Sequence, residues 1–215
     1  MTSLDIDRVK AVLAPHAKMY ESRPPVYQTV MLDDLAQLWQ RNHARLLDIG
    51  GGTGVIAQAI QELLPADVVT SVDVVDRYFP TLSVETRVYD GERLPFDDAS
   101  FDAATINNVM HHIPREIRPG ILKEIRRVVD GPLYIKDHVA GTWLDHRRLT
   151  VLDAIGNLPF GGQIEAWYLS SDDWQSLARE GGYEIVETRT GPYRSGLMAV
   201  AFPNRLEIAM RLEPV

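Results

Sequence analysis

The stretch Arg45-Leu46-Leu47-Asp48-Ile49-Gly50-Gly51-Gly52-Thr53-Gly54 joins a short apolar strand directly to a glycine-rich loop. A helical pattern follows from Val55 to Leu64. Glycines between a strand and a helix allow the backbone to pass close to a ligand, at the end of the sheet where α/β proteins bind small molecules. The stretch therefore predicts an α/β fold with a ligand site at this loop.

Strands and helices alternate on both sides of the loop. The pattern predicts helices at 26–43, 55–64, 115–129 and 171–180, and strands at 45–49, 68–73, 83–89, 101–106, 133–135, 183–189 and 197–202. This rhythm is typical of βαβ units, so we expect a doubly wound α/β domain with a mostly parallel sheet. Residues 139–170 interrupt the rhythm with aromatic, glycine and proline residues. We also expect the helix at Ser171 to begin without a capping box.

The composition excludes several classes of protein. The 215 residues include no cysteine, which rules out disulfides, a thiolate nucleophile and a cysteine-ligated zinc. A net charge of −8 disfavours nucleic acid as a partner. No run approaches the roughly 18 uncharged apolar residues of a membrane helix. We therefore expect a cytoplasmic protein with no membrane or nucleic-acid partner, as a monomer or homodimer.

The spacing of the glycines argues against a dinucleotide site. A dinucleotide fingerprint reads G-x-G-x-x-G, whereas Gly50, Gly52 and Gly54 read G-x-G-x-G and are followed by Val55. Asp48 lies two residues before the first glycine, and a carboxylate there would repel a pyrophosphate. It suits a ligand that carries positive charge.

Acidic residues also follow the next two strands, at Asp73 and at Asp90-Gly91. Together with the glycine loop, they make the chain resemble the class I S-adenosylmethionine-dependent methyltransferases, in particular the small-molecule subgroup (methyltransferase type 11) that includes quinone-biosynthesis enzymes. The resemblance is dense over 45–137 and looser over 171–202. It implies a Rossmann-like seven-stranded sheet with an antiparallel last strand, and S-adenosyl-L-methionine as the cofactor.

The resemblance assigns the first part of the cofactor site. Asp48 and the backbone of Gly50, Gly52 and Gly54 would face the methionine and ribose portion of the cofactor. Asp73 would accept hydrogen bonds from the ribose, and Val74 would pack on the adenine. An alternative for Asp48 is that its carboxylate only organises its own loop.

The remaining assignments lie after the third and fourth strands. Asp90 would meet the adenine amino group, with Gly91 beside it, and Asn107 would lie next to the methionine moiety. Asp90 could instead form a simple turn, and Asn107 could cap a helix. Two departures from the family pattern are Gly51, where relatives have a bulkier residue, and the polar pair Asn107-Asn108.

Three histidines follow predicted strand ends and are candidates for a general base. They are His111, His112 and His138, the last one next to Asp137, which could orient its ring. We expect His112 to be structural by resemblance. Asp137 and His138 alone do not complete a metal site, so we expect no metal. The other histidines, His16, His43 and His146, are expected on the surface.

We therefore expect one domain over 1–215: an N-terminal helical cap (1–44), a cofactor-binding core (45–138), a substrate-covering insert (139–170) and a C-terminal helix and strands (171–215). The insert contains the aromatic residues Trp143, Phe160, Trp167 and Tyr168. The expected activity is methyl transfer to a small metabolite, with O-methylation favoured over C-methylation. Two alternatives are a nicotinamide-dependent oxidoreductase and a non-catalytic cofactor-binding regulatory protein.

Overall fold

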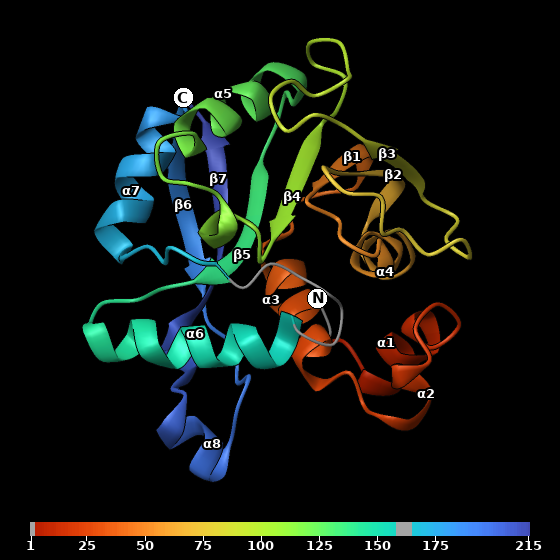
Figure 1. The fold of residues 1–215 in the computed structure, drawn as a ribbon. Coiled ribbons are helices and arrows are strands. Elements are labelled where there is room, and N and C mark those ends of the chain that lie inside the picture. Colours follow the sequence, from red (N-terminus) through yellow and green to blue (C-terminus); the bar gives the residue numbers. More distant parts are fainter. Residues whose placement is uncertain (1–2, 158–164) are drawn as a thin grey trace.

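The computed structural model describes residues 3–157 and 165–215, which form one seven-stranded sheet with helices on both faces (Figure 1). The strands are β1 (His43–Ile49), β2 (Ala66–Asp73), β3 (Glu85–Val88), β4 (Ala103–Asn107), β5 (Leu133–His138), β6 (Tyr183–Arg189) and β7 (Glu207–Pro214). The longer helices are α1 (Ile6–Leu13), α3 (Val26–Leu38), α4 (Val55–Leu63), α5 (Arg118–Val128), α6 (Trp143–Asn157) and α7 (Ser171–Glu180). Shorter ones are α2 (Met19–Ser22), η1 (Met110–His112), α8 (Gly196–Ala201) and η3 (Asn204–Leu206).

The strand order is β3-β2-β1-β4-β5-β7-β6, with β7 alone antiparallel to its neighbours. The predicted doubly wound, mostly parallel sheet with an antiparallel last strand is confirmed. The order reverses between β1 and β4, where Ile49 pairs with Ile106. In such sheets a ligand binds beside the carboxyl ends of the two strands at the reversal.

Helices cover both faces of the sheet, so successive residues of the central strands are buried on opposite sides. Leu46 and Tyr134 face α1, α3 and α4, whereas their neighbours Leu47 and Ile135 face α5 and α7. Successive side chains of a strand point to opposite faces, so strands covered on both sides are apolar throughout. This packing explains the continuous apolar runs in the sequence.

One strand prediction is wrong. Residues 197–202 were expected to form the last strand, but Gly196–Ala201 form α8, with Leu197 and Val200 largely exposed. The last strand is β7 instead. A short apolar run such as 197–202 fits a helix turn as well as a strand, because its length is too short to define a period.

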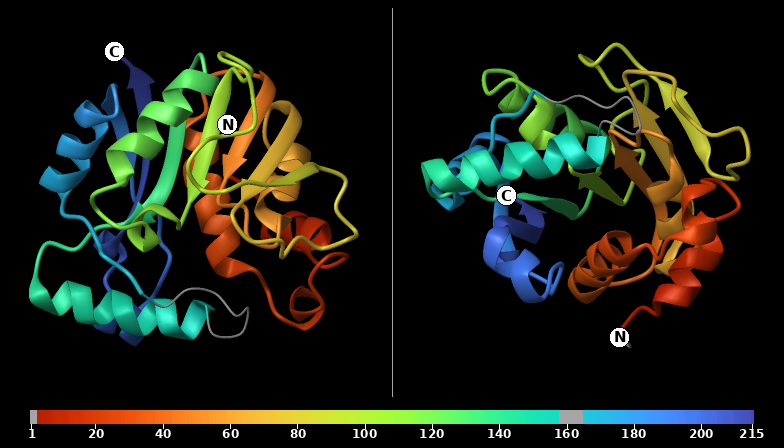
Figure 2. Two further views of the ribbon diagram at one scale, coloured as in Figure 1. Left: turned by 45° about the horizontal axis from the view of Figure 1, so that its top comes forward. Right: turned by 60° about the horizontal axis from the view of Figure 1, so that its bottom comes forward.

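The interrupted region contains a helix that the sequence analysis did not predict. In Figures 1 and 2, α6 lies across the end of the sheet at which β4 and β5 finish. Its start is fixed by reciprocal hydrogen bonds between Thr142 and Asp145, each from a backbone N–H to the other side chain. This is a capping box with aspartate as its acid. Phe160 lies outside the described residues.

Two further expectations are corrected. Helix α7 does have a capping box, formed by Ser170 and Asp173, one residue earlier than expected. His43 is fully buried because it begins β1 rather than ending a helix, and its Nε2 lies 3.0 Å from the Tyr134 hydroxyl. No described helix has both the length and the apolar character needed to cross a membrane.

Candidate active site

The glycine loop leaves β1 in a backbone conformation that favours glycine. Gly50, Gly52 and Gly54 all have positive φ, and Gly54 is the residue before the first turn of α4. A Cβ built on Gly52 would meet no atom within 4 Å, so this part of the loop borders empty space. A Cβ on Gly51 would lie 1.8 Å from Ser71 Oγ, which explains why no bulkier residue stands there.

Asp48 lies behind the loop rather than on its surface. Its buried carboxylate accepts hydrogen bonds from the hydroxyls of Ser71 and Thr105 and from the amide nitrogen of Asn107. Burial raises the pKa of Asp48 above its ordinary value, although these donors oppose the shift. The carboxylate thereby connects β1, β2 and β4 at the reversal of the strand order.

Asp73 ends β2 and is nearly buried, at 5% exposure. Its Oδ2 accepts the Gly52 N–H at 2.7 Å and its Oδ1 accepts the Val75 N–H at 3.0 Å. Each carboxylate oxygen has a second lone pair, so both can accept a further hydrogen bond from a ligand. Asp73 therefore fixes the glycine loop and also faces the space beside it.

Asn107 ends β4 on the other side of the reversal. Its Nδ2 donates to Asp48, while its buried Oδ1 has no hydrogen-bond partner among the described residues. An unpaired buried acceptor costs stability unless a ligand or water satisfies it. The oxygen is thus available to a donor group of a ligand.

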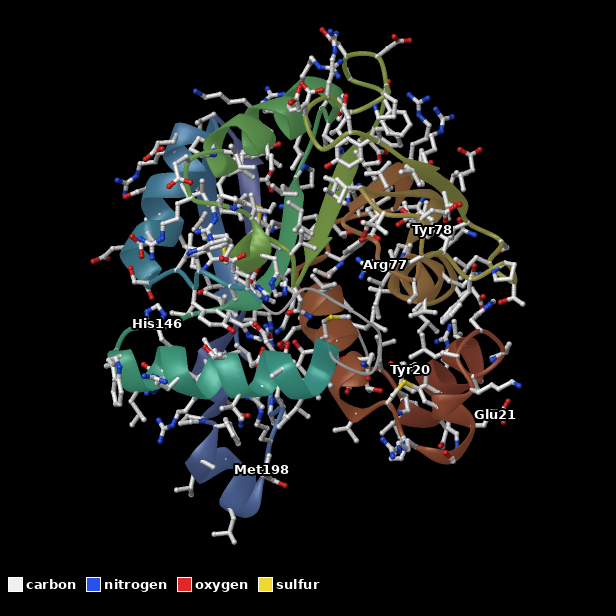
Figure 3. The ribbon with its side chains drawn as sticks, viewed as in Figure 1. Tyr20, Glu21, Arg77, Tyr78, His146 and Met198 are labelled. Carbon is white, nitrogen blue, oxygen red and sulfur yellow. The ribbon has the colours of Figure 1, made fainter. Side chains whose placement is uncertain are left out.

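These residues line one cavity of about 510 Å³. Gly50, Gly52, Asp73, Val74, Gly91 and Asn107 all contribute to its wall. The remaining wall is largely apolar and includes Ile49, Phe79, Ile113, Ile117 and Ile121. Tyr20 and Arg77, labelled in Figure 3, complete it from α2 and from the loop after β2. The structure brings most of the predicted cofactor residues to this one cavity.

Asp90 is placed differently. Its exposed carboxylate accepts the N–H groups of Glu92 and Arg93, and it borders a neighbouring hollow rather than the cavity. These two bonds lower the pKa of Asp90. Its neighbour Gly91 does line the cavity, with a positive φ. Gly54, the last glycine of the loop, also lies outside the cavity wall.

Among the three candidate histidines, His112 alone contributes to the described cavity wall. Its Nδ1 lies 2.8 Å from the Glu165 carbonyl oxygen, and burial lowers its pKa. His111 and His138 are buried behind it. Burial opposes the charged form of His111, but Asp137 and Asp153 outweigh that effect and raise its pKa to about 9.

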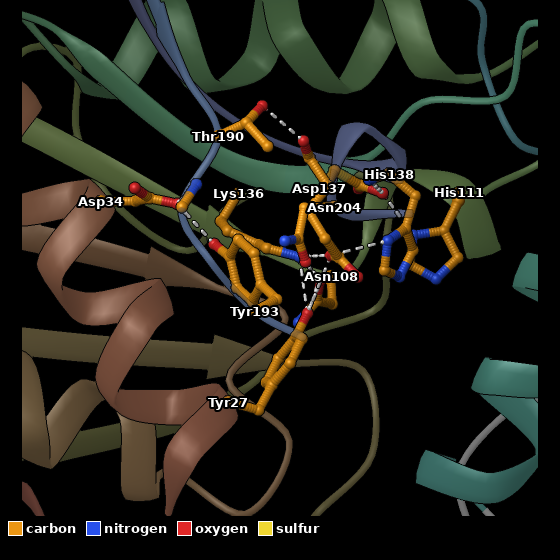
Figure 4. A network of polar contacts seen from close by, with 12 residues as sticks. Tyr27, Asp34, Asn108, His111, Lys136, Asp137, His138, Thr190, Tyr193 and Asn204 are labelled. Atoms are coloured by element: carbon orange, nitrogen blue, oxygen red, sulfur yellow. Dashed lines mark hydrogen bonds and ion pairs between the residues drawn. The ribbon is translucent and has the colours of Figure 1, made fainter. Parts of the chain in front are cut away.

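A polar network next to the cavity was missed by the sequence analysis (Figure 4). Lys136 is fully buried and pairs with Glu207, and its Nζ also donates to the Tyr27 hydroxyl at 2.6 Å and to Asn108 Oδ1 at 3.2 Å. Glu207 in turn accepts from Arg194. The only available signal was a lysine within an otherwise apolar strand, and its partner lay on the strand that had been misplaced.

Comparisons with known proteins find similarity to methyltransferases. Residues 47–131 match a family model described as a methyltransferase domain. A curated malonyl-[acyl-carrier protein] O-methyltransferase from Geobacter sulfurreducens is 27% identical over 197 residues, covering 85% of this chain and 73% of that protein. The uncharacterized methyltransferase YcgJ from Bacillus subtilis is 36% identical over 110 residues, covering 46% of this chain and 43% of that protein.

Solved structures share the fold. A chain from the complex between the Haloferax volcanii Trm112 methyltransferase activator and a methyltransferase has a TM-score of 0.67 at 15% identity, covering 97% of this chain and 96% of that chain. A magnesium protoporphyrin IX methyltransferase from Synechocystis, solved with bound S-adenosylhomocysteine, has a TM-score of 0.60 at 17% identity, covering 93% of this chain and 88% of that chain. The fold, the glycine loop and these matches together support a class I S-adenosylmethionine-dependent methyltransferase.

Proposed function

We propose that this enzyme transfers the methyl group of S-adenosylmethionine to an oxygen of a small apolar or aromatic acceptor, with transfer to carbon as the second candidate. The observation that carries the proposal is the cavity at the reversal of the strand order, which combines a polar part and an apolar part. It is polar at the glycine loop, Asp73 and Asn107, and apolar along Ile113 and Ile117. The polar part suits the cofactor, and the apolar part suits the acceptor.

Two features of the cavity fit the cofactor. The empty space against Gly52 allows a ligand to approach the backbone closely. The unpaired Oδ1 of Asn107 can accept from the ammonium group of the methionine moiety, while Asp73 can accept from the ribose hydroxyls. Asp90 is assigned to the adenine by resemblance, and its bonds to Glu92 and Arg93 would hold Gly91 against the ring.

The bound cofactor supplies a methyl group that is already activated by its sulfonium. The protein must therefore align the acceptor with the methyl group, exclude water and, for a hydroxyl acceptor, remove a proton. Its position in the cavity wall makes His112 our candidate for the base, ahead of His111 and His138. The Geobacter relative is an O-methyltransferase by name, which supports oxygen as the acceptor atom.

Isothermal titration separates this proposal from its alternatives. S-adenosylhomocysteine should bind with one site per chain, and NAD should not bind under the same conditions. Incubation with methyl-labelled S-adenosylmethionine and a panel of phenols, carboxylic acids and carbon acceptors should then give a labelled product. Mass spectrometry and NMR locate the new methyl group. Binding of NAD instead of S-adenosylhomocysteine contradicts the cofactor, and labelling at carbon alone contradicts O-methylation.

The base assignment has its own test. With a hydroxyl acceptor, His112→Gln should lower kcat by about 10²–10⁴, because positioned proton transfer contributes on that scale. The affinity for S-adenosylhomocysteine should stay within twofold of wild type. More acidic acceptors, which ionise without help, should lose less activity. An equal loss for acidic and weakly acidic acceptors would show that His112 acts through the shape of the cavity rather than as a base.

A further inference from the structure

Two buried histidines from different elements direct one ring nitrogen each at the same carboxylate. His111 lies on η1, His138 ends β5 and Asp153 lies on α6. His111 Nε2 is 3.3 Å from Asp153 Oδ2, and His138 Nε2 is 3.5 Å from Asp153 Oδ1. All three side chains are more than nine-tenths buried, and their donor atoms lie within 4.8 Å of one another.

The other nitrogen of each ring faces a second carboxylate. His111 Nδ1 is hydrogen-bonded to Asp137 Oδ1 at 2.5 Å, and His138 Nδ1 lies 3.0 Å from Glu207 Oε2 (Figure 4). In metal sites, a carboxylate on one ring nitrogen fixes the tautomer that leaves the lone pair of the other nitrogen for the metal. In that tautomer both Nε2 lone pairs would face the Asp153 oxygens, and a metal cation between them would remove the repulsion.

The charges of the cluster also favour a bound cation. Among the described residues, Glu207 pairs with Lys136 and Arg194, whereas the ion-pair partners of Asp137 and Asp153 are the histidines alone. If both imidazoles are neutral, as in a metal site, these two buried carboxylates need a compensating positive charge. A divalent cation at the three donor atoms would supply it.

We propose that His111, His138 and Asp153 bind one divalent transition-metal ion of the zinc type. Two imidazoles and one carboxylate suit zinc or iron(II), whereas magnesium and calcium prefer oxygen ligands. Ligand atoms at tetrahedral positions on bonds of 2.0–2.1 Å lie about 3.4 Å apart, close to both measured separations. The Tyr168 hydroxyl donates to Asp153 and would hold its carboxylate in place. The sequence analysis expected no metal because the third ligand lies on the helix that it did not predict.

The metal would connect three segments rather than act on the acceptor directly. None of the three ligands contributes to the described wall of the cavity, but Met110 and His112, on either side of His111, do. A metal at His111 would therefore fix this part of the wall and fasten α6 to the end of β5. This role does not depend on which acceptor the enzyme uses.

The metal alone provides the test. Chelator-treated wild-type protein should bind one Co²⁺ per chain with visible d–d absorption, and one Zn²⁺ should displace it. The chain contains no cysteine, so the absorption reports nitrogen and oxygen ligands. Saturating Zn²⁺ should also raise Tm, because it binds only the folded state. Neither measurement requires S-adenosylmethionine or an acceptor, so both can fail while the proposed function holds.

Variants locate the site. Asp153→Asn and His138→Gln should each lose at least tenfold in Zn²⁺ affinity, and Asp137→Asn should lose about 10–100-fold, as expected for a residue that orients a ligand. His146→Gln, on the same helix but outside the cluster (Figure 3), should bind as wild type. Wild-type protein without cobalt absorption or a zinc-dependent Tm overturns the proposal. Unchanged affinity in Asp153→Asn overturns it as well. Should the variants not fold, the wild-type titration still decides.

Discussion

Asp73 shows how one side chain can hold the loop and face the ligand. Its two oxygens fix the N–H groups of Gly52 and Val75, and the same carboxylate contributes to the cavity wall. Replacing it with alanine should weaken S-adenosylhomocysteine binding by about 1.5–3 kcal/mol, the scale of hydrogen bonds to a charged group. Titration calorimetry measures the loss. The exposed Asp76→Ala serves as the control, and equal affinity in both variants contradicts the ribose assignment.

Gly52 offers a second test at the scale of one residue. Gly52 and Gly196 have φ of 58° and 56°, and a Cβ on either would meet no atom within 4 Å. Alanine at either position should therefore lower the free energy of unfolding by a similar amount, about 1 kcal/mol, because of backbone strain. Gly52→Ala alone should also lose at least tenfold in S-adenosylhomocysteine affinity. Comparable affinities for the two variants would mean that the cofactor does not approach Gly52.

Positions after strands could be predicted from the sequence, but side-chain directions could not. Asp73 and Asn107 follow apolar strands, and parallel strands bring such residues to one edge of the sheet. Whether a carboxylate turns toward the cavity depends on the local backbone. Asp90 turns back to bond the N–H groups of Glu92 and Arg93, a local choice that the sequence alone does not distinguish from ligand contact.

At the scale of elements, α6 illustrates a helix whose capping acid, Asp145, is buried although the residues just before it are exposed. Asp145 forms its capping box and also a two-bond pair with Arg205. The bonds from Arg205 lower the pKa of Asp145 to about 2, against an ordinary value of 3.8. Because the pKa of Asp145 is lower in the folded state, its ionised carboxylate stabilises the fold. This stabilisation is complete above pH 4 and is lost as the pH falls toward 2.

Asp145→Asn should therefore lower the free energy of unfolding by about 1 kcal/mol near neutral pH, a small value because the Arg205 side chain is largely exposed. The difference from wild type should shrink between pH 4 and pH 2. Urea unfolding at pH 6 and pH 3 measures it. Asp172→Asn, an exposed acid in the first turn of α7, is the control. A difference that does not change with pH would show that the loss comes from the cap alone.

Helices and strands with a clear sequence pattern could be predicted. Those that depend on contacts with neighbouring strands or helices could not. Strands β1 and β2 contain short apolar or β-branched runs, and α7 has acidic residues at its start. In β7, Arg211 and Glu213 alternate with buried apolar residues, so the segment became recognisable only once its neighbours were known. Helix α6 ends beside residues outside the described part of the chain, and its glycine and aromatic content resembled a loop.

At the scale of the whole molecule, the Lys136–Glu207 pair joins the middle of the sheet to its last strand. Both side chains are fully buried. Burial opposes the charge of Lys136, yet Glu207 and Tyr27 outweigh it and keep its pKa above the ordinary value. Removing one member of a buried pair leaves an uncompensated charge, so Glu207→Gln should cost about 3–5 kcal/mol of unfolding free energy. Chemical denaturation under chelator measures this.

Glu213→Gln, on the same strand but partly exposed, is the matched control and should cost less than 1 kcal/mol. If Glu207→Gln lowers the free energy of unfolding no more than Glu213→Gln does, the buried network has rearranged so that another group pairs with Lys136.

The strand order also has a consequence for how the chain is made. Strand β7 is the last in the sequence, yet it lies between β5 and β6. As the protein leaves the ribosome, β6 therefore has no neighbour to join, and Lys136 has no counterion, until residues 207–214 have emerged. Domains tend to fold from the N-terminus during synthesis. Here a nascent chain can assemble β1 to β5 early but must wait for its final strand, which makes a ribosome stalled just before residue 207 the natural point of vulnerability to aggregation and to chaperone capture.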